Sequence, residues 1–132
     1  MSFCTVVNCM DGRTQLPVIT YMQERFDLPY VDSVTEPGPV MILSGDAAPE
    51  LVSSILNRVR ISVEQHGSRT VGVVAHADCT GNPATEEEQL LQLERSVAVV
   101  TEAFPDVRVL GLWIDECWSV HERFDVGNSA AA

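Results

Sequence analysis

The sequence predicts a single α/β domain built on a four-stranded parallel sheet, with the strands in the order 2-1-3-4 and helices on both faces. Short apolar runs alternate along the chain with longer stretches in which apolar residues recur at helical spacing. One of these runs, at 70–77, is almost continuously apolar, which is typical of a parallel strand buried on both faces. The length of 132 residues suffices to enclose one hydrophobic core.

The first two strands are predicted at 3–9 (FCTVVNC) and 30–35 (YVDSVT). The helix between them is predicted from apolar residues at helical spacing, which are Leu16, Ile19, Met22 and Phe26. The turn signal EPGP ends the second strand, and a linker follows it. A second helix is predicted to begin at Pro49, a favourable first-turn residue, and to end at Gly67.

The third and fourth strands are predicted at 70–77 (TVGVVAHA) and 107–114 (VRVLGLWI). The helix between them begins at the capping box TEEE, residues 85–88, and Pro105 ends it. The segment CWSVHERF that comes after the fourth strand is predicted to be an amphipathic closing segment. The alternation of strands and helices therefore predicts a parallel sheet with right-handed crossovers.

Charge, hydropathy and cysteine content limit the classes of function. The formal net charge is -11, with eight Arg and no Lys, which argues against nucleic acid or an anionic membrane as a partner. We expect a cytoplasmic protein, because the chain has no apolar run of about 20 residues and MSFCTVVNC lacks the features of a secretory signal. Its four Cys are then expected to bind metal or act in catalysis rather than form disulfides. The domain is expected to span 1–126, followed by a flexible tail at 127–132.

Two clusters of reactive side chains end neighbouring strands of the predicted sheet. Cys9, Asp11 and Arg13 stand where the first strand gives way to a turn, and His76 and Cys79 follow the third strand. The carboxyl ends of parallel strands meet at one edge of a sheet, so we expect both clusters to face one crevice. Two thiolates and one imidazole form a three-ligand Zn²⁺ site with a fourth position open to water. The sequence therefore predicts that Cys9, His76 and Cys79 bind zinc.

Asp11 and Arg13 are candidate catalytic residues beside this site. A carboxylate that accepts a hydrogen bond from a zinc-bound water would orient that nucleophile. An Arg that binds the carboxylate through two hydrogen bonds would fix its direction. The alternative interpretation is an ion pair that only stabilises the turn, since turns favour Asp and Gly.

The remaining Cys and His residues have simpler interpretations. Cys4 and Cys117 are predicted to be packing residues rather than ligands. His66 is predicted at the carboxyl end of a helix, where a cation suits the helix dipole. His121 is interpreted as a surface or interface residue rather than a proton shuttle.

The two motifs together, Cys-x-Asp-x-Arg at 9–13 and His-x-x-Cys at 76–79, resemble those of the β-class carbonic anhydrases. The resemblance covers roughly residues 3–115, and the chain is similar to a small, divergent subfamily. It implies a zinc lyase that reversibly hydrates CO2 to bicarbonate through a zinc-bound hydroxide. Two alternatives stay open: hydrolysis of carbonyl sulfide or carbon disulfide at the same zinc, and a zinc-binding module without turnover.

The resemblance also implies a homodimer or a higher homo-oligomer. Trp113, Ile114 and Trp118 lie near the end of the chain, and we expect them to form an apolar patch that a partner subunit covers. The expected partners are therefore a second copy of the chain and a small substrate, either CO2 and bicarbonate or a sulfur analogue.

Overall fold

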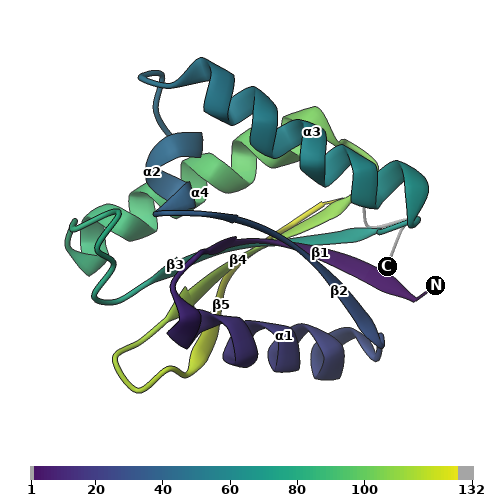
Figure 1. Cartoon of the computed structure of the whole chain (residues 1–132), viewed down its shortest axis with the longest axis horizontal. Helices are drawn as coiled ribbons and strands as arrows, with labels where there is room; N and C mark the ends of the chain where they lie inside the picture. Colours follow the sequence, from purple (N-terminus) through teal and green to yellow (C-terminus); the bar gives the residue numbers. More distant parts are fainter. Residues whose placement is uncertain (1, 128–132) are drawn as a thin grey trace.

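A five-stranded sheet forms the centre of the structure, a computed structural model that describes residues 2–127 (Figure 1). In the order of the sheet, the strands are β2 (Tyr30–Glu36), β1 (Phe3–Cys9), β3 (Thr70–His76), β4 (Arg108–Ile114) and β5 (Val120–Val126). The helices are α1 (Gly12–Phe26), α2 (Pro39–Leu43), α3 (Pro49–Gln65) and α4 (Glu86–Ala103). None of these helices has the length and apolar character needed to cross a membrane. Of the tail predicted at 127–132, residues 128–132 lie outside the described residues.

The four predicted strands and their order are confirmed. β1 pairs in parallel with both β2 and β3, and β3 pairs in parallel with β4. α1 covers one face of the sheet, whereas α2, α3 and α4 cover the other (Figure 1). The predicted caps are also present: the Thr85 hydroxyl accepts a hydrogen bond from the Glu88 amide at 3.2 Å, and Gly67 follows α3 with a φ of +71°. The four parallel strands therefore end at one edge of the sheet.

The fifth strand, β5, corrects the predicted four-stranded sheet. It pairs antiparallel with β4 and occupies the segment predicted to be an amphipathic closing segment. Because β5 lies at the sheet edge, most of its side chains are exposed, and its sequence carries little of the pattern of a buried strand. Arg108 of β4 anchors it by donating two hydrogen bonds to the Asp125 carboxylate, at 2.9 and 2.7 Å. The short helix α2 likewise lies in a segment predicted to be a linker.

Each face of the sheet carries its own apolar core, and these cores correct a prediction about the surface. Trp113 packs into the core on the α3 and α4 side, and Ile114 packs into the core on the α1 side. Their exposed fractions are only 2% and 0%, because successive side chains of β4 point to opposite faces and both faces are covered. The prediction that Trp113 and Ile114 join Trp118 in an exposed patch is therefore wrong.

The two cysteines predicted to be packing residues lie in different environments. Cys4 is buried in the core on the α1 side, where burial, followed by the charge of Asp32, raises the pKa of its thiol to about 11. A thiol with such a pKa stays protonated and unreactive, as expected of a packing residue. Cys117 is exposed in the connection between β4 and β5, so the packing prediction for Cys117 is wrong.

Candidate metal centre

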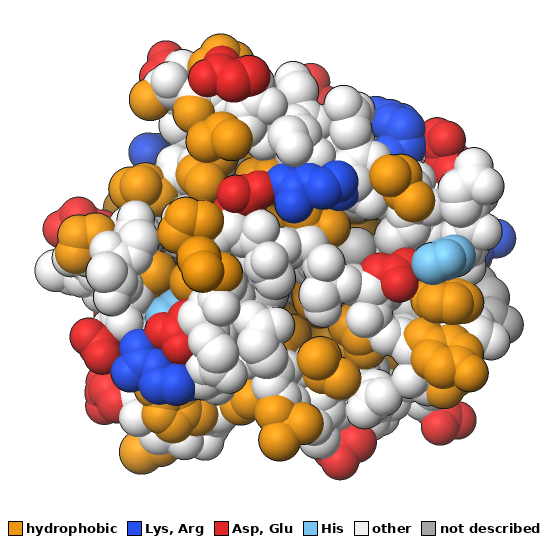
Figure 2. Space-filling model, viewed as in Figure 1, with side chains coloured by type: hydrophobic (Ala, Val, Ile, Leu, Met, Phe, Trp, Pro, Cys, Tyr) orange, Lys and Arg blue, Asp and Glu red, His pale blue; other side chains and the backbone are white. Residues whose placement is uncertain are grey.

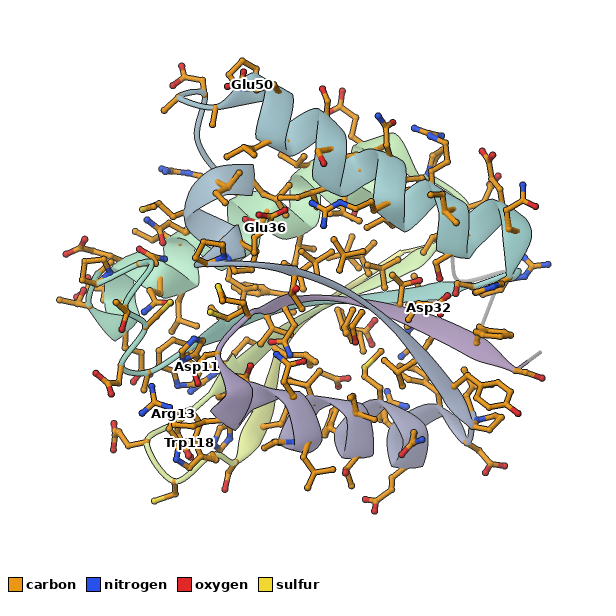
Figure 3. All side chains as sticks on the ribbon, viewed as in Figure 1. Asp11, Arg13, Asp32, Glu36, Glu50 and Trp118 are labelled. Atoms are coloured by element: carbon orange, nitrogen blue, oxygen red, sulfur yellow. The ribbon has the colours of Figure 1, made fainter. Side chains whose placement is uncertain are left out.

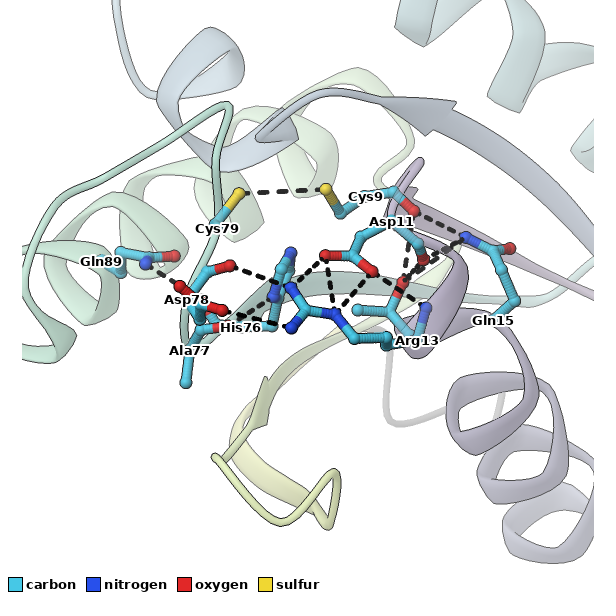
Figure 4. Close-up of polar contacts among 10 residues, drawn as sticks. Cys9, Asp11, Arg13, Gln15, His76, Ala77, Asp78, Cys79 and Gln89 are labelled. Carbon is cyan, nitrogen blue, oxygen red and sulfur yellow. Dashed lines mark hydrogen bonds and ion pairs between the residues drawn. The ribbon is translucent and has the colours of Figure 1, made fainter.

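Three metal-ligating side chains lie together at the carboxyl edge of the sheet. Cys9 is the last residue of β1, His76 is the last residue of β3, and Cys79 lies in the loop that follows. All three are buried, and their ligand atoms lie within 4.8 Å of one another (Figure 4). The structure thus brings together the three residues that the sequence analysis placed in one crevice, because β1 and β3 are parallel neighbours.

The donor atoms suit a zinc ion. The Sγ atoms of Cys9 and Cys79 are 3.9 Å apart, much farther than the about 2.05 Å of a disulfide. Two sulfurs bound tetrahedrally to one zinc at about 2.3 Å would be separated by about 3.8 Å. His76 Nδ1 donates to the Ala77 carbonyl at 2.7 Å, so Nε2 carries the free electron pair. Among the described residues, Nε2 of His76 is the one buried side-chain polar atom without a hydrogen-bond partner, which is what a metal ligand requires.

The electrostatics of the two thiols differ although they are neighbours. Burial raises the pKa of Cys9, but the neighbouring His76 imidazole and the backbone amides of Gly38 and Asp11 outweigh it and lower the pKa to about 7. Burial and the adjacent Cys9 sulfur raise the pKa of Cys79 to about 11. Without a cation the pair therefore retains a proton near neutral pH, and a bound cation would release it.

Buried amides and close loop packing hold the loop that carries Cys79. The Gln89 side chain is 2% exposed, and its Nε2 donates to the His76 carbonyl at 3.0 Å and to the Asn82 carbonyl at 3.4 Å. Gly81 packs against Pro37 so closely that a Cβ on Gly81 would lie 2.7 Å from the Pro37 carbonyl carbon. Only glycine allows this approach, which connects the loop to the segment after β2.

The turn after β1 is held by polar side chains as well. The Cys9 amide donates to the Asn8 Oδ1 atom at 2.8 Å, and Gln15 Nε2 donates to the Cys9 carbonyl at 2.7 Å. The sequence analysis missed the roles of Asn8, Gln15 and Gln89. For a polar residue in a strand or in the first turns of a helix, the sequence does not show whether its side chain is buried and hydrogen-bonded or exposed to solvent.

Asp11 and Arg13 form an ion pair beside the three-residue cluster. Arg13 Nε and Nη2 donate to the two carboxylate oxygens of Asp11, at 3.1 and 2.7 Å (Figure 4). Hydrogen bonds from Arg13 lower the pKa of Asp11 to about 2. The same carboxylate accepts the Arg13 amide at 2.9 Å as the N-cap of α1, so it also has the turn-stabilising role left open from the sequence. Arg13 further donates to Asp78, both to its carboxylate and to its carbonyl, at 3.2 Å each.

Trp118 completes the surroundings of Arg13 and was not predicted as a site residue. The Arg13 Cζ atom lies 4.5 Å from the centroid of the Trp118 ring. The ring centroids of Trp118 and His76 are 6.2 Å apart. Figure 3 shows Asp11, Arg13 and Trp118 next to one another. No local sequence signal indicates this contact, because β5 and its turn were not predicted.

The other two histidines lie away from the cluster. His66 Nδ1 pairs with the Asp32 carboxylate at 2.6 Å, and its ring stacks on Phe3 at 4.1 Å, near the start of β1. His121 Nε2 pairs with the Asp115 carboxylate at 2.7 Å and is exposed. The surface position of His121 agrees with its interpretation from the sequence.

Known proteins share this arrangement of strands. Residues 1–123 match the family described as "Putative carbonic anhydrase". The β-carbonic anhydrase isoform I of Trichomonas vaginalis has 17% identity and a TM-score of 0.58, over 90% of this chain and 80% of that one. A tetrameric β-carbonic anhydrase of Sordaria macrospora has 13% identity and a TM-score of 0.61, over 93% of this chain and 82% of the Sordaria chain. The β-carbonic anhydrase CafA of Aspergillus fumigatus has 16% identity and a TM-score of 0.51, over 96% of this chain and 78% of the CafA chain.

At these identities the solved structures show a shared fold, and a comparison with curated proteins gave no match. The family match carries the assignment, since it extends over nearly the whole sequence of 132 residues. The chain belongs to the family described as "Putative carbonic anhydrase".

Proposed function

We propose that this protein is a zinc lyase that reversibly hydrates CO2 to bicarbonate. Membership of the carbonic anhydrase family supports the reaction. The observation that carries the proposal is the buried group of Cys9, His76 and Cys79, whose ligand atoms lie within 4.8 Å of one another and include an unpaired imidazole nitrogen. Two thiols and an imidazole suit zinc better than Mg²⁺ or Ca²⁺, which prefer oxygen ligands.

Each site residue has a role in this proposal. Cys9, His76 and Cys79 would hold the zinc, which when bound would supply an ionised water near neutral pH as the nucleophile for CO2. Asp11 would accept a hydrogen bond from the attacking water and so orient its lone pair toward the substrate. Arg13 would keep the Asp11 carboxylate in one direction through the hydrogen bonds at 3.1 and 2.7 Å.

The test is CO2 hydration by the zinc-loaded protein, followed in a stopped-flow instrument with a pH indicator. We expect turnover well above the uncatalysed rate, lost on removal of zinc with a chelator and restored by adding zinc. A rate equal to that of buffer, at full zinc occupancy, would contradict the proposal. Release of hydrogen sulfide from carbonyl sulfide or carbon disulfide would then favour the hydrolase, and its absence would favour a zinc-binding module.

We also propose that the chain forms a homodimer or a higher homo-oligomer. An apolar hollow of about 440 Å³ lies beside α2, lined by Pro37, Met41, Ile42, Ala47, Ala48, Leu51 and Gly81. Figure 2 shows hydrophobic side chains gathered over α2 and the start of α3, where Met41 and Leu51 are 44% and 41% exposed. A patch of this kind is typical of an interface. The similar enzyme of Sordaria macrospora is tetrameric.

Light scattering tests the assembly. We expect a mass at least twice the 14.4 kDa of one chain at micromolar concentration, and a lower mass for Met41→Asp, because a charge would be buried in the contact. Ile61→Asp on α3 is the matched control, since Ile61 is 58% exposed and outside the hollow. A wild-type mass of one chain would contradict the proposal.

The cytoplasmic location stays a prediction from the sequence, as does the exclusion of nucleic acid and membrane partners based on the net charge of -11. Fractionation of the cells that produce the protein would test both. Recovery with the membrane or nucleic acid fraction would contradict them.

A further inference from the structure

Trp118 has a backbone conformation that is unusual for a large side chain. Its φ is +64°, in the left-handed region that favours glycine. A residue with a Cβ is strained there, and such strain persists where the surroundings impose it. Glycine would adopt this backbone conformation without strain, so the turn itself does not require a Trp here.

The connection between β4 and β5 imposes this conformation through one carboxylate. Asp115 Oδ1 accepts the amides of Cys117 at 2.8 Å and Ser119 at 3.0 Å, and the Trp118 amide donates to the Asp115 carbonyl at 3.0 Å. Asp115 Oδ2 pairs with His121 Nε2 at 2.7 Å, which ties the turn to β5. These hydrogen bonds fix the backbone of the turn and thereby the direction of the Trp118 Cα–Cβ bond.

That direction places the indole ring against the guanidinium of Arg13. The Arg13 Cζ atom lies 4.5 Å from the ring centroid, within the range of a cation–π contact. The donors at the edge of the same guanidinium bind Asp11 and Asp78. Hydrogen bonds thus hold the donors of Arg13, and the contact with the indole adds a further restraint on the same guanidinium. Asp11, Arg13 and Trp118 lie next to one another in Figure 3.

The second restraint matters because the ion pair is open to water. The Arg13 side chain is 47% exposed and the Asp11 side chain is 19% exposed. An ion pair at such exposure holds its geometry weakly, since water competes for both partners. An indole ring whose centroid lies 4.5 Å from Arg13 Cζ limits the orientations open to the guanidinium.

We propose that Trp118 is a positioning residue that holds the Arg13 guanidinium, and through it the Asp11 carboxylate, beside the cluster of Cys9, His76 and Cys79. The consequence for catalysis rests on the proposed function, in which Asp11 orients the attacking water. The contact between Trp118 and Arg13 can be tested without reference to catalysis.

The test compares Trp118→Leu with Trp118→Phe in the zinc-loaded protein. Leu keeps a Cβ and an apolar side chain in the turn but has no aromatic face, whereas Phe keeps that face. The first readout is the NMR resonance of the Arg13 Nε–H group, which the ring current of the indole displaces in the wild type. We expect Trp118→Leu to abolish this displacement and Trp118→Phe to retain part of it.

The second readout is CO2 hydration, measured with the zinc content and the thermal unfolding midpoint of each variant. We expect Trp118→Leu to lower the turnover by about tenfold or more at unchanged zinc content and midpoint, and Trp118→Phe to recover most of it. Ile61→Ala, on the exposed side of α3, is the control and should match the wild type. In an Arg13→Gln background, Trp118→Leu should cause no further loss, because the group that it positions is gone.

Two results would overturn the inference. One is an Arg13 Nε–H resonance that is the same in the wild type and in Trp118→Leu. The other is an equal fold-loss from Trp118→Leu with and without Arg13. A zinc-loaded wild type that does not hydrate CO2 would overturn the proposed function instead, and the NMR comparison would still decide whether Trp118 fixes Arg13.

Discussion

Replacement of Cys79 by Ser is expected to reduce bound zinc from about one ion per chain to less than about a tenth, and CO2 hydration to the uncatalysed rate. The hydroxyl of Ser does not ionise near neutral pH and is a much poorer zinc ligand than a thiolate. The remaining pair, Cys9 and His76, cannot fill a three-ligand site. Zinc is measured by atomic emission after gel filtration, and the thiolate-to-metal absorption of the cobalt-substituted protein reports the ligand directly.

Cys117→Ser is the matched control for this experiment. Cys117 is exposed and lies outside the cluster, so its replacement should leave zinc content and cobalt absorption unchanged. Because Cys79 is buried, a Ser hydroxyl there costs stability, so the thermal unfolding of both metal-free proteins is measured in parallel to show that the Cys79→Ser protein is folded. Full zinc occupancy in Cys79→Ser would contradict the assignment of Cys79 as a ligand.

Asp11→Asn is expected to lower the turnover for CO2 by about a hundredfold or more while the zinc content stays the same. Asn is nearly isosteric and is also a good N-cap residue, so α1 should keep its start and only the carboxylate charge is lost. The neutral amide also loses the ion pair with Arg13. Stopped-flow hydration assays on both proteins measure the effect.

The pH dependence of this comparison follows from the pKa of Asp11. Arg13 lowers that pKa to about 2, so the carboxylate is ionised above this value and would become protonated only as the pH falls toward it. Between about pH 6 and 9 the fold-loss in Asp11→Asn should therefore be constant. Asp46→Asn, an exposed position between α2 and α3, is the control. Equal rates for Asp11→Asn and the wild type would show that Asp11 only stabilises the turn and takes no part in the reaction.

Strong local signals made most of the fold predictable. β3 reads as a nearly continuous apolar run because both of its faces are buried. Thr85 and Gly67 could be recognised as helix ends because caps depend on a few neighbouring residues. The Thr85 hydroxyl accepts a hydrogen bond from the Glu88 amide, and Gly67 adopts a positive φ after the end of α3. The order 2-1-3-4 is one of the common orders of doubly wound parallel sheets, and it is the one that makes the first and third strands, and hence the two reactive clusters, neighbours.

β5 and the burial of Trp113 could not be predicted in the same way. An edge strand has one partner and exposed faces, so its own residues need not alternate, and β4 supplies the pairing. A Trp suits both a protein interior and an interface between subunits, so the residue type alone does not separate the two. The Trp113 side of β4 is buried because α4 packs on it, and the residues of β4 do not show which face a helix covers.

By itself, the sequence determined the chemistry of the candidate centre: two thiols and an imidazole at the ends of two neighbouring parallel strands, with a carboxylate and a guanidinium beside them. Only the tertiary structure decided which atoms face the centre. His76 Nε2 is free because Nδ1 donates its proton to the Ala77 carbonyl, and Arg13 has a cation–π contact because a turn more than 100 residues later brings Trp118 to it. Residue types set what a site can bind, whereas the direction of each donor depends on contacts between segments that only folding brings together.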